Sequence, residues 1–289
     1  MTIAYKRLLI LLAVAAPLAS AQRILAGPAA PSVMAADMQI GNSQKLRSMA
    51  AQLFALTNEA RAARGLPALE WDPALAAAAL NHCARMAAEG PLSHQYPGEP
   101  DLTERAGQAG ARFSYIEENV AEGYEPGSIH QQWMHSPGHR DNLLNRAVNR
   151  MGVAVVAQGN MLYAVEDFAR AVPVLSPEQV EAAVANLVEE TGVAAHGNSP
   201  GARQACAEDH GLPASLDSRR PEFIMRWEAA ELDRLPEALL ERIATGRYHE
   251  AAVGSCSAPS AASTFTSYHV AVLLLRPVSG ASRTLVSSK

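Results

Sequence analysis

Hydrophobic residues in the first half of the chain recur at the spacing of α-helices. Within residues 45–64 one stripe holds Leu46, Met49, Leu53, Leu56 and Ala60, and Gly65 follows as a stop. A second helix is predicted from Pro73, with Asp72 at its N-cap, to Gly90. Shorter helices are predicted within residues 101–115 and 126–134. The pattern therefore places several helices ahead of the first long strand.

Pro137 interrupts the helical pattern of "WMHSPGHRDNLL", because it lacks an amide donor and clashes with the preceding turn. Ser136 is predicted as the N-cap of a new helix with Pro137 at its first position. His135 and His139 are four residues apart, but the break assigns them to different elements. We therefore do not expect these two histidines to bind a metal as a pair.

After residue 150 the hydrophobic period changes to two. The stretch "MGVAVVAQGNMLYAVEDFA" contains two β-rich runs, which predict a hairpin with Gly159-Asn160 at its turn. Helices first and a small antiparallel hairpin last indicate an α+β domain over residues 45–170. Trp71 and Trp133 are expected to anchor its core, since large aromatic side chains dominate burial.

Residues 171–289 form a second region. Ser176, Pro177 and Gln179 predict a helix with a capping box, ending at Gly192. Residues 193–220 are polar and contain Gly, Pro and Ser, which predicts a loop or linker. Residues 226–246 predict a helix that is interrupted or restarted at Pro236.

Two further β-rich runs, residues 247–256 and 266–277, predict a second strand pair that weakly resembles the first. A degenerate repeat is one interpretation. The other, which the sequence alone favours, is that alternating strands resemble one another by default. These strands could also extend the first sheet, so the sequence does not decide whether 171–289 folds alone.

The first 21 residues have the pattern of a signal peptide. Lys6 and Arg7 precede an apolar run too short for a comfortable membrane span, and Ala19-Ser20-Ala21 is a small-x-small cleavage site. An uncleaved N-terminal anchor is the alternative. No other stretch is long and apolar enough to span a membrane, so we expect a secreted or periplasmic protein. Residues 22–44 are predicted to be a linker or flexible arm.

Charge and cysteine usage narrow the function. Loss of residues 1–21 removes Lys6, Arg7 and no acidic residue, which takes the formal net charge from -5 to -7. A mildly acidic chain argues against nucleic acid as a partner. Three cysteines are too few for a disulfide scaffold. Cys206 and Cys256 could pair in an oxidising compartment, and Cys83 is expected to be a buried, inert thiol.

Several stretches occur in a fixed order, namely "LTNEARAARGLPALEWDP", "LSH", "EENVAEG", "WMHSPGHRDNLLN" and "YAVEDF". In order and spacing, residues 46–170 resemble the CAP superfamily of cysteine-rich secretory, antigen 5 and pathogenesis-related proteins, in its bacterial SCP-like branch. The resemblance implies an α-β-α sandwich for this segment. Residues 171–289 show no such resemblance, and their pattern indicates a C-terminal helix-plus-strand extension of unknown role. It also implies a cleft with two histidines and two acidic residues, where some members bind a divalent metal.

Carried over residue by residue, the resemblance makes His94 and His139 the two histidines and Glu118 the first acid. Ser136 stands where the family has its second acid, and a serine supplies no carboxylate. His94 and His139 are thus the candidate metal ligands, and together with Glu118 they are the candidate catalytic residues. Asn119, Ser136 and Glu166 are candidates for contacts with a ligand.

The candidate residues support more than one chemistry. Two imidazoles and a carboxylate suit Zn²⁺, and a bound water could then hydrolyse an ester or amide. Without metal the same groups could act as an acid/base pair. A triad of Ser136, a histidine and Glu118 would need hydrogen-bond reach between its members.

Three functions therefore remain open. The first is an exported binding module for a small molecule, a lipid or an envelope component, with a divalent metal such as Zn²⁺ as the one cofactor considered. The second is a peptidase- or esterase-type hydrolase. The third is a structural envelope protein with a vestigial cleft. The sequence leaves open whether the protein is an enzyme.

Overall fold

The computed structural model of the protein describes residues 33–208, 211, 221–257 and 265–276. The chain divides into two compact units, residues 1–42 and 43–289, and the description below concerns the second, apart from the start of the first helix. Helix α1 spans Val33–Ala62. The predicted arm over residues 22–44 is thus wrong from Val33 onward, because the helix predicted to begin at residue 45 begins twelve residues earlier. The predicted signal peptide lies outside the described residues.

The first sheet has four strands in the order β1-β3-β4-β2. The strands are β1 (Glu70–Trp71), β2 (Phe113–Gly123), β3 (Arg150–Gln158) and β4 (Met161–Ala171). β1 pairs parallel to β3, and the other pairs are antiparallel. The predicted hairpin is confirmed, with Gln158 paired to Met161 across a turn in which Gly159 has a φ of 59°. β2 contains "EENVAEG", a polar stretch for which the hydrophobic pattern predicted no strand.

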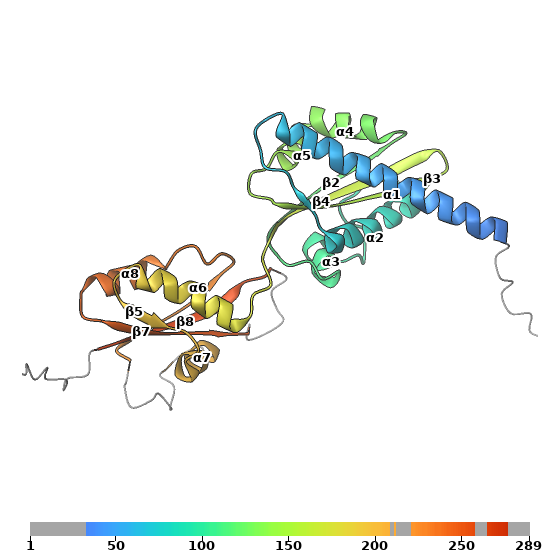
Figure 1. Ribbon diagram of the computed structural model, residues 1–289. Helices are drawn as coiled ribbons and strands as arrows, with labels where there is room; N and C mark the ends of the chain where they lie inside the picture. The colour runs from blue at the N-terminus through green and yellow to red at the C-terminus, as the bar shows by residue number, and fades with distance from the viewer. Residues whose placement is uncertain (1–32, 209–210, 212–220, 258–264, 277–289) are drawn as a thin grey trace, which may run out of the picture. The chain divides into compact units, whose positions relative to one another are not determined.

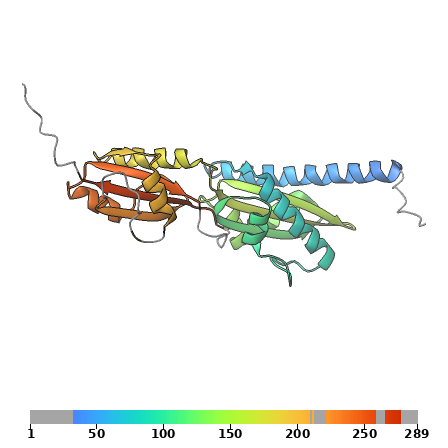
Figure 2. The same cartoon turned by 90° about the horizontal axis from the view of Figure 1, so that it is seen from below.

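Helices cover both faces of this sheet (Figures 1 and 2). They are α2 (Pro73–Glu89), α3 (Leu102–Gln108), α4 (Pro126–His135) and α5 (Pro137–Leu143), in addition to α1. Leu53, Trp133 and Leu143 bring α1, α4 and α5 into one hydrophobic cluster with the strands. α2 packs its alanine-rich face on the opposite side, against β3 and β4. The α+β class and the α-β-α layering are thus as expected. Trp133 is buried, but Trp71 is 43% exposed, so its prediction as a core anchor was wrong.

Residues 171–276 build a second four-stranded sheet, in the order β5-β7-β8-β6. Its strands are β5 (Ala194–His196), β6 (Phe223–Ala229), β7 (Glu250–Cys256) and β8 (Tyr268–Leu275). The predicted strand pair is confirmed as β7 and β8, but it does not extend the first sheet. The predicted loop over 193–220 was wrong where β5 and helix α7 (Pro200–Ala207) lie. The residues before Pro236 form β6 rather than a helix.

The second sheet repeats the topology of the first. β5 pairs parallel to β7, β7 pairs antiparallel to β8, and β8 pairs antiparallel to the edge strand β6, as β1, β3, β4 and β2 do. Helices α6 (Pro177–Glu189) and α8 (Glu237–Ala244) share one hydrophobic cluster with the strands, and α7 packs on the other face. α6, α7 and α8 therefore take the places of α1, α2 and the α4–α5 pair. The repeat interpretation, which the sequence alone did not favour, describes this topology.

Individual residues at the ends of helices also correspond between the two sheet-forming regions. Gly65 and Gly192, which follow α1 and α6, both have positive φ, where a side chain would strain the backbone. α2 and α7 both begin at a proline, after Asp72 and Ser199, whose side-chain oxygens accept hydrogen bonds from the first turn. The capping box of Ser176 at α6 is also formed. Local signals thus start and end matching helices in both halves of the chain.

A disulfide joins Cys206 on α7 to Cys256 on β7, so the two cysteines that could pair do so. Cys83 is a free thiol buried in α2, and burial raises its pKa to about 12. At that pKa the thiol is protonated and unreactive at neutral pH, as expected. None of the helices in the described part of the chain has the length and apolar character needed to cross a bilayer.

Candidate functional site

Glu118 lies at the centre of the candidate site. It sits on β2 opposite Asp167 of β4, and its side chain is 3% exposed. One carboxylate oxygen, Oε1, is 2.9 Å from Nδ1 of His94, and the other, Oε2, accepts a hydrogen bond from Arg105 at 2.6 Å. Arg105 is itself buried on α3. Both oxygens of Glu118 are therefore engaged by cationic or potentially cationic partners.

His94 lies on the loop between α2 and α3 and contributes the exposed part of the site. Its side chain is 61% exposed, although its Nδ1 is held by Glu118. The hydrogen bond to Glu118 raises the pKa of His94, against a smaller opposing effect of burial. The ring thus has a fixed orientation, a large exposed surface and an increased tendency to carry a positive charge.

His139, the second candidate histidine, lies in the first turn of α5. Burial lowers its pKa, and the positive charge of His94 lowers it further, so the two rings are close enough to interact electrostatically. Asn119 positions this turn, because its Nδ2 donates to the carbonyl oxygen of His139 at 3.0 Å. Asn142 in turn donates to Oδ1 of Asn119 at 2.9 Å. Asn119 therefore connects β2 to α5 inside the fold.

The structure separates the other candidates from this group. Ser136 occupies the N-cap position of α5, as predicted, but its side chain makes no cap hydrogen bond. Ser136 also makes no hydrogen bond to His94 or His139 among the described residues. His135 belongs to α4, with its Nδ1 2.7 Å from the carbonyl oxygen of Gln131. The two histidines of the proline-broken segment thus lie on different helices.

Glu166 is buried on the α1 side of the sheet rather than beside Glu118. Thr57 of α1 donates to its Oε1 at 3.1 Å, and Oε2 has no partner in the described part of the chain. Burial raises the pKa of Glu166 to about 8. Successive residues of a strand point to opposite faces, which is why Glu166 and Asp167 diverge.

Three residues of the site escaped the sequence analysis. His82 of α2 is buried, with Nδ1 2.8 Å from Oε1 of Glu99 and Nε2 2.9 Å from the carbonyl oxygen of Ser93. Its Nε2 is also 3.9 Å from Oε2 of Glu118. Arg105 supplies the buried cation described above. His82 and Arg105 therefore lie next to Glu118, although no local sequence motif predicts either of them there.

Asp167 is the third of these residues. It is fully buried, and neither of its carboxylate oxygens has a hydrogen-bond partner among the described residues. Burial raises its pKa well above the ordinary value, and the negative charge of Glu118 raises it further. Asp167 therefore favours the protonated form at neutral pH. The signal was present in "YAVEDF", where strand alternation puts this carboxyl on the same face as Glu118.

The donor set does not fit a divalent metal. Within the residues that the structure describes, no group of three or more His, Cys, Asp or Glu side chains is placed to hold a metal ion. Both oxygens of Glu118 are already engaged, and Ser136 stands at the position of the second acid. A Zn²⁺ site needs three or four such ligands converging on one point.

A three-layer α-β-α domain in which Glu118 of the edge strand β2 is hydrogen-bonded to His94 of a loop defines the class of protein. Residues 54–168 match the model of the cysteine-rich secretory protein family, CAP. This segment therefore matches a CAP domain, and it makes up less than half of the chain.

Two curated relatives come from Bacillus subtilis (strain 168). The uncharacterized membrane protein YlbC is 34% identical over 105 residues, which are 36% of this chain and 30% of YlbC. The uncharacterized protein YkwD is 31% identical over 107 residues, 37% of this chain and 42% of YkwD. The similarity thus spans less than half the length of either relative.

Among solved structures, an extracellular SCP-domain protein from Bacillus anthracis str. Ames is 31% identical, with a TM-score of 0.42. It covers 44% of this chain, which in turn covers 42% of that protein.

Proposed function

We propose that the CAP domain binds a small anionic ligand, a phosphate- or carboxylate-bearing lipid or envelope component, at the exposed side of His94. One observation carries this proposal: the His94 side chain is 61% exposed, yet its Nδ1 is fixed by a buried carboxylate on a β-strand. An exposed donor that is already held in one orientation loses little conformational entropy when a ligand binds.

The charge of the site favours an anion over a cation. Glu118 raises the pKa of His94, so a larger fraction of the imidazole is positively charged near neutral pH. The negative charge of Glu118 itself is buried and paired with Arg105. A ligand approaching from solvent therefore meets the imidazolium rather than the carboxylate.

The disulfide favours a location outside the cytoplasm for the protein and therefore for its ligand. The disulfide between Cys206 and Cys256 is a bond that persists in secreted and periplasmic proteins and is rare in the cytosol. The sequence of residues 1–21 favours the same location. We propose that the protein acts in the periplasm or outside the cell.

A hydrolase is the second candidate, and the opposite pKa shifts of the two histidines favour it. The pKa of His94 is raised and that of His139 is lowered, which is the pattern of a general acid beside a general base. An activated nucleophile is missing from this arrangement in the described residues. Ser93 donates its hydroxyl to the carbonyl of Gln95, and Ser136 has no recorded bond to either histidine. The hydrolase mechanism that remains is attack on the substrate by a water molecule that His139 deprotonates.

The test is an NMR titration of the histidine rings in the mature chain. The probes are dihexanoyl phosphatidylglycerol, which is anionic, the zwitterionic dihexanoyl phosphatidylcholine, and inorganic phosphate. We expect the anionic lipid to shift the His94 ring resonances and His94→Gln to abolish that binding. His135→Gln is the matched control, because His135 is an exposed histidine on a different helix.

The outcomes separate the candidates. Saturable shifts at His94 with the anionic lipid, absent with phosphatidylcholine, support the proposal, and equal shifts with phosphate assign the recognition to the phosphate group. Absence of a saturable shift at His94 with any of the three probes would overturn it in favour of a vestigial cleft, and equal affinity in His94→Gln and wild type would overturn it by placing the binding elsewhere. Hydrolysis of p-nitrophenyl acetate that is lost in His139→Gln would favour the hydrolase instead.

A further inference from the structure

The second sheet keeps the CAP topology but not the chemistry of Glu118. Gly152 pairs with Asp167, which pairs with Glu118, and Gly254 pairs with Ala271, which pairs with Arg226. Because both glycines sit under a closely packed helix, these pairings align the two sheets. Arg226 thus takes the place of Glu118 and donates to backbone carbonyls of Ala205 and Gly211. The histidine–glutamate pair has no counterpart on this strand.

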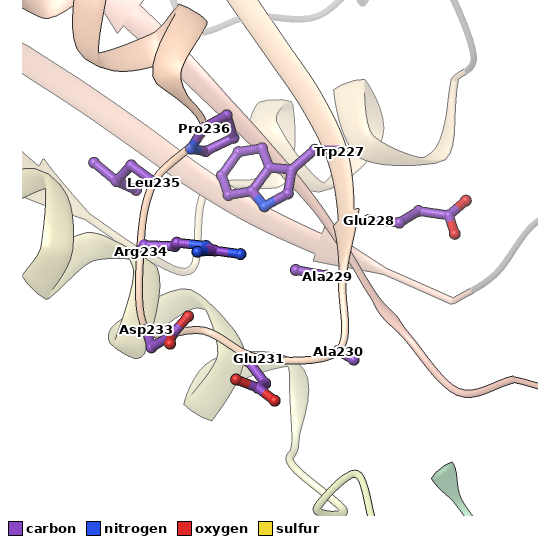
Figure 3. Close-up of a pocket in the computed structure, with 9 residues that line it drawn as sticks. All are labelled: Trp227, Glu228, Ala229, Ala230, Glu231, Asp233, Arg234, Leu235 and Pro236. Carbon is purple, nitrogen blue, oxygen red and sulfur yellow. The ribbon is translucent and has the colours of Figure 1, made fainter. Parts of the chain in front are cut away.

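The next position along the strand contributes to a cavity. Trp227 takes the place of Asn119, and it lines a cavity of about 380 Å³ formed by residues 227–236 (Figure 3). In the first sheet the corresponding connection, from β2 to α4, is only Tyr124-Glu125. The connection from β6 to α8 runs from Ala230 to Pro236 and curves around the cavity. A volume of this size holds a small metabolite, at the lower end of ligand pockets of roughly 300–1,000 Å³.

Two hydrogen-bond donors that have no partner among the described residues line this cavity. The indole nitrogen of Trp227 and the guanidinium of Arg234 point toward the same space in Figure 3. Neither group has a hydrogen bond or ion pair with any residue that the structure describes. Both are donors only, and the fork of a guanidinium matches a carboxylate in a bidentate arrangement. The two donors therefore suit a ligand carboxylate.

The remaining lining gives the ligand its other features. Asp233 also points inward in Figure 3 and has no recorded partner in the described ranges, so it suits an ammonium group. Pro236 adds an apolar surface beside the indole, while the Leu235 side chain points away from it into the hydrophobic core. The lining carries three carboxylates and one guanidinium, a balance that disfavours a purely anionic ligand. The carboxylate that binds Trp227 and Arg234 must therefore belong to a molecule that also carries a positive charge.

We infer that the cavity beside the second sheet binds an α-amino acid with an apolar side chain. The carboxylate contacts Arg234 and the indole nitrogen of Trp227, the ammonium group contacts Asp233, and the side chain packs against Pro236 and the indole ring. This site is separate in residues and chemistry from the proposed anion site at His94, so either proposal can fail without the other.

The experiment is isothermal titration calorimetry of the full chain with L-leucine, L-leucinamide and N-acetyl-L-leucine. The amide lacks the carboxylate, and the acetyl derivative lacks the ammonium group. We expect L-leucine to bind and each derivative to bind at least about tenfold more weakly, the effect of losing one hydrogen-bonded charge. Arg234→Gln and Trp227→Phe should weaken leucine binding by a similar factor.

Arg247→Gln is the matched control, since Arg247 is an exposed arginine of the same unit that does not line the cavity. Leucine affinity within twofold of wild type is expected for it. Arg234 is exposed and makes no recorded bond in the described residues, so its substitution is expected to leave the melting temperature unchanged. Absence of leucine binding at millimolar concentration, or binding that survives both Arg234→Gln and Trp227→Phe, would overturn the proposal.

Discussion

Gly152 on β3 and Gly254 on β7 occupy matching points of the two sheets. A Cβ atom added to Gly152 would lie 2.1 Å from the amide nitrogen of Ala76, and one added to Gly254 would lie 2.1 Å from the carbonyl carbon of Ala202. Both contacts are with helix backbone, which cannot move aside as a flexible side chain can. Each glycine therefore sets how closely α2 or α7 approaches its sheet.

Gly254→Ala is expected to lower the free energy of unfolding by about 2 kcal/mol, since the methyl group forces α7 away from β7. Urea unfolding, with hydrogen exchange of the β7 and β8 amides, measures the effect. Gly127→Ala is the control, because Gly127 is a helical residue of α4 with no atom within 4 Å of an added Cβ. A Gly254→Ala protein as stable as the control would contradict the close-packing argument.

Glu118→Gln is expected to lower the pKa of His94 toward its ordinary value of about 6.5, because the hydrogen bond to the carboxylate is what raises it. The titration of the His94 ring by NMR measures this change. The substitution also leaves Arg105 buried without its charge partner, which costs roughly 3–5 kcal/mol of stability. Glu117→Gln, at a neighbouring carboxylate that does not contact His94, should leave the His94 titration unchanged.

The sign of the pH dependence follows from the same pair. A histidine whose pKa is raised on folding stabilises the folded state fully below its unfolded pKa of about 6.5. That contribution is lost as the pH rises through the folded pKa. The wild-type protein should therefore lose stability relative to Glu118→Gln above about pH 6.5, and an unchanged difference across this range would contradict the pairing.

Glu166→Gln is expected to stabilise the protein at alkaline pH. Burial raises the pKa of Glu166 to about 8, so the folded state resists the ionisation that the unfolded chain undergoes near 4.5. The wild type thus loses stability as the pH rises from about 4.5 to about 8, by up to roughly 5 kcal/mol. Glutamine removes this loss. Stability differences measured from pH 4 to 9 test it, with Glu59→Gln, at an exposed glutamate, as the comparison variant.

Reduction of the disulfide is expected to destabilise the region of the second sheet by about 3–4 kcal/mol. Cys206 and Cys256 are 50 residues apart, and a link of that length restricts the unfolded chain substantially. Denaturant unfolding with and without dithiothreitol measures the change. The Cys206→Ser/Cys256→Ser variant should unfold with the same midpoint in both conditions. A response of that variant to reductant would locate the effect elsewhere.

The sequence predicted those elements whose signals are local. Asp72, Ser176 and Pro137 start helices where expected, and Gly159-Asn160 turns the first hairpin. β2 was missed because "EENVAEG" is polar in sequence. Its Glu118 and Asn119 are buried only because partners from α3 and α5 satisfy them. A strand of this kind carries no hydrophobic alternation to detect.

The candidate site was predictable only in part for the same reason. The resemblance to the CAP family supplied His94 and Glu118, which the structure brings into contact. Arg105, His82 and Asp167 come from three separate elements, and tertiary packing alone brings them to Glu118. Glu166 was expected near a ligand, but strand alternation turns it to the opposite layer, where Thr57 binds it.

The different lengths of the β2–α4 and β6–α8 connections bear on how such a chain changes over time. Two residues close the first connection, and Ala230 to Pro236 close the second, although the strands they follow hold the same rank in their sheets. These connections contribute little to stability, which comes from the packing of helices on strands. A new ligand specificity can therefore arise by lengthening the connection in one sheet region. The other sheet region, which contains Glu118 and His94, keeps its own chemistry.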